Sequence, residues 1–337
     1  MTPTKGSRAL AEALVAQLRL PVFAGPMFIA STAALLIEQC KAGIIGSLPA
    51  LNLRSTELLD AAISQIVAAL AEHDRTHPDQ PAAPYAINLV AHKTNDRVAP
   101  DLEILVKHRV PVVIVSLAAP VEIVTAVHGY GGLVFNDVIS DRHARRCAES
   151  GVDGLIAVAA GAGGHTGNIS PFALMQEIRA WWDGPLALSG CIATGRSVLA
   201  AQAMGADFAY IGSPFLASEE ANTAQGFKDM IVASTSADIM VTNCFTGVPA
   251  TFLRPSIEAN GLDPKALVRD PDAGINIKDG GSNAKAWRDI WSAGQGIGII
   301  DRSEKARDYI ARLAGEYAAA QQALSRQLQH RAASQPG

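Results

Sequence analysis

The stretch AAGAGGHTG, residues 159–167, places one histidine among four glycines directly after the apolar run GLIAV. Small neighbours would let this backbone approach a flat ligand closely, and would leave the imidazole of His165 as the side chain with the longest reach. An ordinary histidine pKa of about 6.5 allows that imidazole to remove a proton from an acidic carbon near neutral pH. A histidine in a glycine loop can also be an exposed residue without a role. We interpret His165 as a catalytic base.

Two further loops have the composition of a phosphate site. The segments SGCIATG (189–195) and GSPF (212–215) consist largely of small residues, and the first precedes a helical pattern. Backbone N–H groups at the start of a helix stabilise a phosphate dianion, and a Cβ atom in the loop would hold the anion away from them. A glycine at either place can also serve a tight turn. Because two such loops follow successive apolar runs, we predict that together they bind one phosphate.

The composition argues against nucleic-acid, metal and membrane proteins. A net charge of −4 provides no basic surface for nucleic acid. The cysteines at 40, 147, 191 and 244 form no CxxC pair, so neither a zinc site nor a disulfide framework is expected. Charges interrupt the N-terminal SRALAEALVAQLRL, which predicts a short amphipathic helix rather than a targeting or membrane segment. We expect a cytoplasmic protein without metal; the sequence leaves its oligomeric state open, a homodimer included.

Eight short apolar runs predict the strands that would position the histidine loop and the two phosphate loops. Each run is continuous rather than alternating, as is typical of strands covered on both faces, and amphipathic helical patterns such as residues 58–70 separate them. Eight βα units predict a (β/α)8 TIM barrel, with a doubly wound open sheet as the alternative. The runs span residues 21–27, 42–49, 85–91, 110–117, 132–138, 154–160, 185–190 and 208–214.

Polar and small residues gather at the carboxyl ends of these runs, which favours the barrel. In a TIM barrel all strand carboxyl ends meet at one face, where the βα loops build the active site. The runs would therefore bring distant segments of the chain to one place. The residues concerned are Asn88, Ser116, Asn136, Asp137, His165, Ser189, Gly190, Gly212 and Ser213.

Five motifs in a fixed order resemble the nitronate monooxygenase family, formerly called 2-nitropropane dioxygenases. They are GPM, GAGGHTG, LSGCIATGRSVLAAQAMGADFAYIGSPFLASEE, TNCFTGVPATFLR and IWSAGQGIGIID, and the match covers roughly residues 20–301. The resemblance implies an FMN-binding TIM barrel, whose relatives include FMN-dependent enoyl-ACP reductases and an NADH:quinone reductase.

The resemblance also implies a reaction and a cofactor site. The reaction is oxidation of alkyl nitronates, and of neutral nitroalkanes, by O2 to a carbonyl compound and nitrite, with His165 as the base. The alternative is an NAD(P)H-dependent flavin reductase acting on a quinone or an enoyl thioester; a flavin-binding protein without catalysis would not need His165. The residues expected to bind FMN are Gly25, Pro26, Met27, Asn88, Gly163, Gly164, Ser189, Gly190, Gly212, Ser213, Gly294 and Gln295.

The sequence departs from the family pattern in two places. The glycine pair of the first phosphate loop is replaced by SGC, and GTRF by GSPF. At the end of the fifth run, Asn136 and Asp137 stand where many relatives carry a basic residue near the flavin. Loss of a positive charge there would make reduced, anionic flavin less stable.

One segment interrupts the barrel pattern after the eighth run. We predict a barrel from residues 1–220 and 286–330, with an inserted lid or substrate domain at 221–285. Within the insert FKDMIVAS has a helical pattern, and PDAGINIKDGGSN would form a glycine-rich loop capping the site. A closing helix follows residue 303, and residues 331–337 are expected to be a disordered tail.

Overall fold

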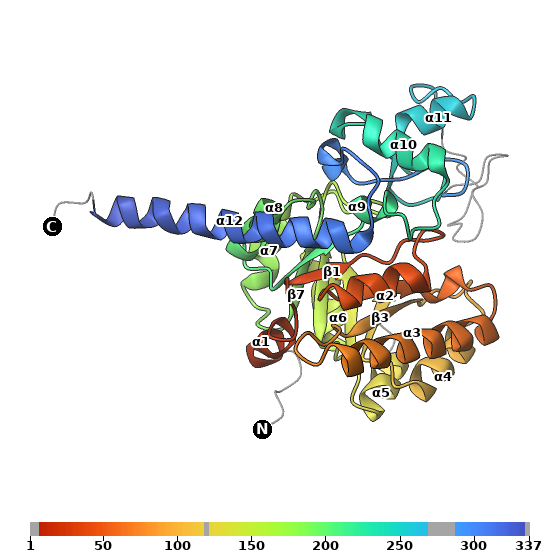
Figure 1. Ribbon diagram of the computed structural model, residues 1–337. Helices are drawn as coiled ribbons and strands as arrows, with labels where there is room; N and C mark the ends of the chain where they lie inside the picture. Colours follow the sequence, from red (N-terminus) through yellow and green to blue (C-terminus); the bar gives the residue numbers. More distant parts are fainter. Residues whose placement is uncertain (1–6, 118–120, 269–286, 334–337) are drawn as a thin grey trace.

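The apolar runs form a barrel in a computed structural model that describes residues 7–117, 121–268 and 287–333 (Figure 1). Every run contains a strand, and neighbouring strands pair in parallel in the order β1-β8-β7-β6-β5-β4-β3-β2. The ring closes because Ala24 N–H donates to the Ile45 carbonyl at 2.8 Å and Ile45 N–H donates to the Val22 carbonyl at 3.0 Å. The predicted TIM barrel is confirmed. The strands are β1 (Val22–Ala24), β2 (Gly46–Pro49), β3 (Tyr85–Val90), β4 (Val112–Ser116), β5 (Leu133–Val138), β6 (Gly154–Val158), β7 (Leu186–Ser189) and β8 (Phe208–Ile211).

Helices cover the outside of the barrel, where their apolar stripes pack on the strands. Hydroxyl side chains begin several of them: Thr32, Ser55, Ser140 and Thr194 each accept a hydrogen bond from a first-turn N–H group. The helices around the barrel are α2 (Ala33–Lys41), α3 (Thr56–Thr76), α4 (Val98–Lys107), α5 (Val121–Gly129), α6 (Asp141–Glu149), α7 (Pro171–Arg179), α8 (Gly195–Ala203) and the single turn α9 (Ser213–Leu216).

Alternate strand residues fill the barrel interior. The Phe23 ring lies 5.1 Å from the rings of both Phe135 and Phe208, centroid to centroid, and Leu14 of α1 (Arg8–Val15) packs into the same cluster. Arg8 of that helix pairs at 2.6 Å with buried Asp207, which directly precedes β8. Helix α1 therefore closes the amino end of the barrel.

The segment predicted as an insert forms a small layer over the carboxyl end of the barrel (Figure 1). The helical pattern FKDMIVAS lies in α10 (Gln225–Ala233), and β9 (Ile239–Thr242) pairs antiparallel with β10 (Ala250–Leu253) before α11 (Arg254–Ala259). Short 3-10 helices occur at Ala50–Asn52, Ser236–Asp238 and Gln295–Ile299. The proposed capping loop at 271–283 lies outside the described residues, and the bounds of the insert stay a prediction.

The chain closes with α12 (Ala306–Ala333), which packs on α8 and α2 and then extends beyond the body of the molecule (Figure 1). Its buried stripe includes Ile310 and Leu313. The helix continues to residue 333, three residues into the segment predicted to be a tail; residues 334–337 lie outside the described part of the chain. No described helix has both the length and the apolar character needed to cross a membrane.

Candidate active site

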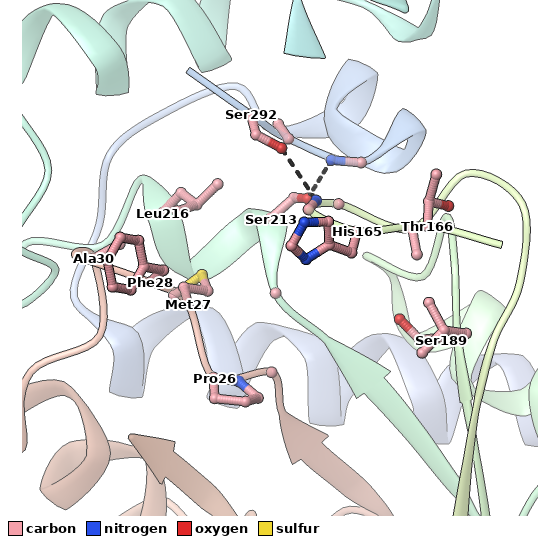
Figure 2. A pocket seen from close by; sticks show the side chains of 18 of the residues that line it. Pro26, Met27, Phe28, Ala30, His165, Thr166, Ser189, Ser213, Leu216 and Ser292 are labelled. Carbon is pink, nitrogen blue, oxygen red and sulfur yellow. Dashed lines mark hydrogen bonds between the residues drawn. The ribbon is translucent and has the colours of Figure 1, made fainter. Parts of the chain in front are cut away.

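A cavity of about 710 Å³ opens at the carboxyl end of the barrel. Its walls include His165 and every residue predicted to bind the cofactor except Gln295, although these residues come from six separate segments of the chain. Figure 2 shows Phe28, Ala30 and Leu216 gathered on one side of His165, with Ser189 and Thr166 on the other. The predicted residues that line the cavity are Gly25, Pro26, Met27, Asn88, Gly163, Gly164, Ser189, Gly190, Gly212, Ser213 and Gly294.

His165 is positioned by the hairpin β9–β10 as well as by the barrel. The residue forms an isolated antiparallel bridge with Ala250 of β10. On either side of it, Thr166 N–H donates to the Pro249 carbonyl at 3.2 Å, and Thr251 N–H donates to the Gly164 carbonyl at 3.0 Å. The glycine loop after β6 thus runs alongside β10 like a short third strand, which fixes the backbone from which the imidazole projects.

The imidazole of His165 faces the cavity. The edge of Trp287 packs against it at 5.5 Å between ring centroids and 77° between planes. Within the described part of the chain, the ring makes no hydrogen bond. The surrounding protein lowers the pKa of His165 below its ordinary value because burial disfavours the charged form. Both nitrogens are therefore available to a ligand, and one of them can accept a proton.

Ser213 and two glycines join the loops that follow β6 and β8 to the late segment. Gly294 N–H donates to the Ser213 hydroxyl oxygen at 2.8 Å, which leaves the hydroxyl hydrogen for another acceptor (Figure 2). A Cβ atom on Gly163 would lie 2.9 Å from the nitrogen of Gly294, and one on Gly294 would lie 2.8 Å from the nitrogen of Gly163. These glycines are required for the close approach of two backbones, whatever ligand the cavity holds.

The loops after β7 and β8 fit a phosphate group. The backbone N–H groups of Cys191, Ile192, Gly212 and Ser213 make no hydrogen bond within the described residues, so they remain available as donors. Thr194 caps α8 just behind them, and the helix dipole adds positive potential.

The two glycines of these loops differ in what a side chain would meet. A Cβ atom on Gly212 would reach only Met27, at 3.9 Å, and otherwise open space. Gly190 has φ +132° and a Cβ there would lie 3.0 Å from the Ala160 carbonyl oxygen. Gly212 therefore leaves room for a ligand, whereas Gly190 is also required by the backbone itself.

Three adjacent strands place a row of polar groups on the cavity wall. Asn88 Nδ2 donates to the Ser116 hydroxyl at 2.8 Å, and that hydroxyl donates to Asp137 Oδ2 at 2.6 Å. Burial raises the pKa of Asp137 to about 6, although the hydrogen bonds from Ser116 and from Leu117 N–H work in the opposite direction. A carboxyl group that titrates near neutral pH therefore lies in the same cavity as His165.

Two residues singled out by the sequence do not face the cavity. Asn136 is fully buried, and its Nδ2 donates to the Asp137 carbonyl; it follows Phe135, which points into the barrel, so it points outward. Gln295 begins a 3-10 helix outside the cavity wall, where its N–H donates to the Gly161 carbonyl at 2.9 Å. Of the pair at the end of β5, only Asp137 can influence a ligand directly.

The structure also brings into the cavity residues to which the sequence assigns no role. Phe227 stacks on Trp291 at 5.0 Å and 10°, and together with Phe28 and Leu216 they form an apolar arm of the cavity. His143 of α6 lines the wall as well. No sequence signal marks these side chains, because they come from segments with ordinary amphipathic patterns. Among the described residues, no three His, Cys, Asp or Glu side chains are grouped as a metal site requires.

The chain is similar to a known family, to individual proteins and to solved structures. A family model described as nitronate monooxygenase matches residues 11–316. A Mycobacterium tuberculosis protein with a provisional monooxygenase name is 33% identical over 272 residues, or 73% of this chain and 72% of that protein. A Rhodococcus jostii protein named as an octahydro-1H-indene-4-carboxyl-CoA dehydrogenase is 27% identical over 247 residues, or 73% of this chain and 64% of that protein. The structure of nitroalkane oxidase from Streptomyces ansochromogenes has a TM-score of 0.74 at 22% identity, covering 93% of this chain and 99% of the other.

Proposed function

The chain belongs to the nitronate monooxygenase family of flavin oxidoreductases, and from this premise we propose that it oxidises alkyl nitronates with O2 to a carbonyl compound and nitrite. The observation that carries the proposal is the cavity-facing imidazole of His165, which hairpin β9–β10 holds beside a phosphate-type site. Bound FMN would supply the electron acceptor that neither His165 nor any other side chain of the cavity provides. The substrates are small molecules: the nitronate or nitroalkane, and O2.

The residues present fit FMN. Its phosphate would lie against the free N–H groups of the loops after β7 and β8, with the Ser213 hydroxyl as a further donor. The wall formed by Gly25, Pro26 and Met27 would lie against the flavin ring. The loops after β7 and β8 would hold one phosphate group, which supports FMN rather than FAD.

His165 would act on neutral nitroalkanes. The carbon next to a nitro group carries an acidic proton, and a neutral imidazole within hydrogen-bond reach can accept it. The lowered pKa of His165 keeps the ring unprotonated at neutral pH and therefore ready as a base. The apolar arm with Phe227 and Trp291 would bind the alkyl chain away from water.

Replacement of His165 by Asn tests this role. A nitronate has already lost the proton that the base removes, whereas a neutral nitroalkane has not. We expect His165→Asn to reduce kcat/KM on the nitroalkane by roughly 100- to 10,000-fold and to retain much of the activity on pre-formed nitronate. His77→Asn, on the exposed end of α3, is the matched control. Equal losses on both substrates would show that His165 orients the substrate instead of deprotonating it.

The Rhodococcus jostii relative supports a second candidate, because its name describes a dehydrogenase of a CoA thioester. In that case the protein would be an NAD(P)H-dependent flavin reductase acting on an enoyl thioester or a quinone. Anaerobic mixing of the yellow protein with NADH, NADPH and propionate 3-nitronate in turn distinguishes the two. Bleaching by the nitronate alone supports the first candidate, and bleaching by a reduced nicotinamide alone supports the second.

A further inference from the structure

Asn88, Ser116 and Asp137 form the polar row on the cavity wall, and the hydrogen bonds between them have a fixed direction. Both hydrogens of the Asn88 amide are committed, one to the Ile114 carbonyl at 3.1 Å and one to the Ser116 hydroxyl at 2.8 Å. A carbonyl can only accept, so the amide cannot be reversed. Ser116 then has one hydrogen, which it donates to Asp137. The row consequently presents acceptors to the cavity: Asn88 Oδ1 and the carboxyl group of Asp137.

No cation among the described residues is paired with Asp137. Tyr210 of β8 and Cys147 of α6 lie close enough to interact electrostatically with it, but burial raises the pKa of both groups, that of Cys147 to about 12, so both are neutral. Arg288 lines the cavity and forms an ion pair with Asp289 at 2.7 Å.

The two cavity histidines do not supply a positive charge either. Burial lowers the pKa of His143, with a smaller contribution from Arg146, and burial also lowers that of His165. Both rings are therefore neutral above pH 7, where the Asp137 carboxyl is ionised. The negative charge on Asp137 is thus uncompensated by any of these neighbours.

We propose that Asp137 couples the two-electron reduction of the bound flavin to the uptake of two protons instead of one. This rests on the flavin site of the proposed function. Two electrons and one proton would leave the flavin anionic in the same cavity as a carboxylate, and the two like charges would repel each other. A second proton, bound by the flavin or by Asp137 itself, removes one of the two charges. In the assay the two electrons come from dithionite.

The midpoint potential of the holoprotein between pH 7 and 9 measures this stoichiometry. Uptake of two protons changes the reduction equilibrium 100-fold per pH unit, or about 59 mV, and uptake of one proton changes it tenfold, or about 30 mV. We expect the steeper slope in the wild type and the shallower one in Asp137→Asn. Glu122→Gln, an exposed carboxylate on α5 outside the cavity, is the control for net charge and should keep the steeper slope.

A second variant keeps the carboxyl and changes only its partner. Ser116→Ala removes the shortest hydrogen bond to Asp137, so the carboxyl should stay protonated to higher pH and the steep region should begin at higher pH. An unchanged slope in Asp137→Asn with flavin bound would overturn the proposal. This outcome is independent of the substrate: a protein that fails to oxidise nitronate can still show the two-proton slope, and an active nitronate oxidase can lack it.

Discussion

Replacement of Asp137 by Asn should make the folded protein more stable at alkaline pH. Burial raises the pKa of Asp137 from an ordinary 3.8 to about 6, so the folded state prefers the protonated carboxyl more strongly than the unfolded state does. The resulting stability is fully present below pH 3.8 and is lost as the pH rises through 6. Asparagine has the same shape and carries no charge, and its amide oxygen can still accept the hydrogen bond from Ser116.

The size of the effect follows from the pKa shift. A shift of about two units at about 1.4 kcal/mol per unit corresponds to about 3 kcal/mol. Asp137 is half-buried and borders a cavity open to water, so this value is a ceiling, and we expect about 1 to 3 kcal/mol at pH 8. The gain over the wild type should decrease steadily between pH 6 and pH 4.

Urea denaturation of flavin-free protein from pH 4.5 to 8.5 measures the difference, because removal of the flavin eliminates the contribution of ligand binding. Glu122→Gln, carried through the same series, corrects for the change in net charge. A variant that is less stable than the wild type at pH 8, or a difference that does not depend on pH, would refute the assignment of Asp137 as a destabilising buried carboxylate.

Three further outcomes are expected. Mass spectrometry of the released cofactor should find FMN; FAD would contradict the single-phosphate site. Gly212→Val should purify without flavin while retaining its fold by circular dichroism, because the new side chain would occupy the space left for the phosphate; full flavin occupancy would place the phosphate elsewhere. For straight-chain nitronates kcat/KM should rise by up to about fourfold per methylene, and Trp291→Ala should flatten this series if the apolar arm binds the chain.

The barrel could be predicted because its strands are buried on both faces. Such strands give continuous apolar runs, and eight of them separated by helical patterns leave few folds to choose from. The ends of strands were less predictable: the run at 42–49 contains a strand only at Gly46–Pro49, since Ala42 caps α2 and Gly43 turns the chain with φ +89° before pairing with β1 begins at Ile45. Loop residues and strand residues are equally apolar there, so the residue types do not show where the strand begins.

Because both faces of β5 are apolar, the sequence does not show which of its residues faces the cavity. Phe135 points into the barrel while Val134 and Val138 pack against helices, yet all three are apolar, so the pattern does not reveal the direction of Asn136 or Asp137. The sequence singled out His165 as a candidate because its neighbours are glycines, and the structure places it in the cavity wall. The partners that position it, in β10 and after residue 286, follow it by more than eighty residues and meet it only through tertiary packing.

One wall of the cavity presents hydrogen-bond donors and the other presents acceptors. This difference determines how an anionic ligand would be oriented in the cavity. The loops after β7 and β8 present N–H donors that no described residue accepts from, and such donors attract anions, whereas the polar row presents the acceptors of Asn88 and Asp137. A nitronate carries its negative charge on the nitro oxygens, so above pH 6 that group is repelled from Asp137 and has its favourable contacts on the side of His165. The alkyl chain gains most by entering the apolar arm with Phe227 and Trp291. If the proposed reaction is correct, the charge that would disfavour an anionic reduced flavin would therefore also orient the anionic substrate, which would give one reason for a carboxyl group at the end of β5 in place of a basic residue.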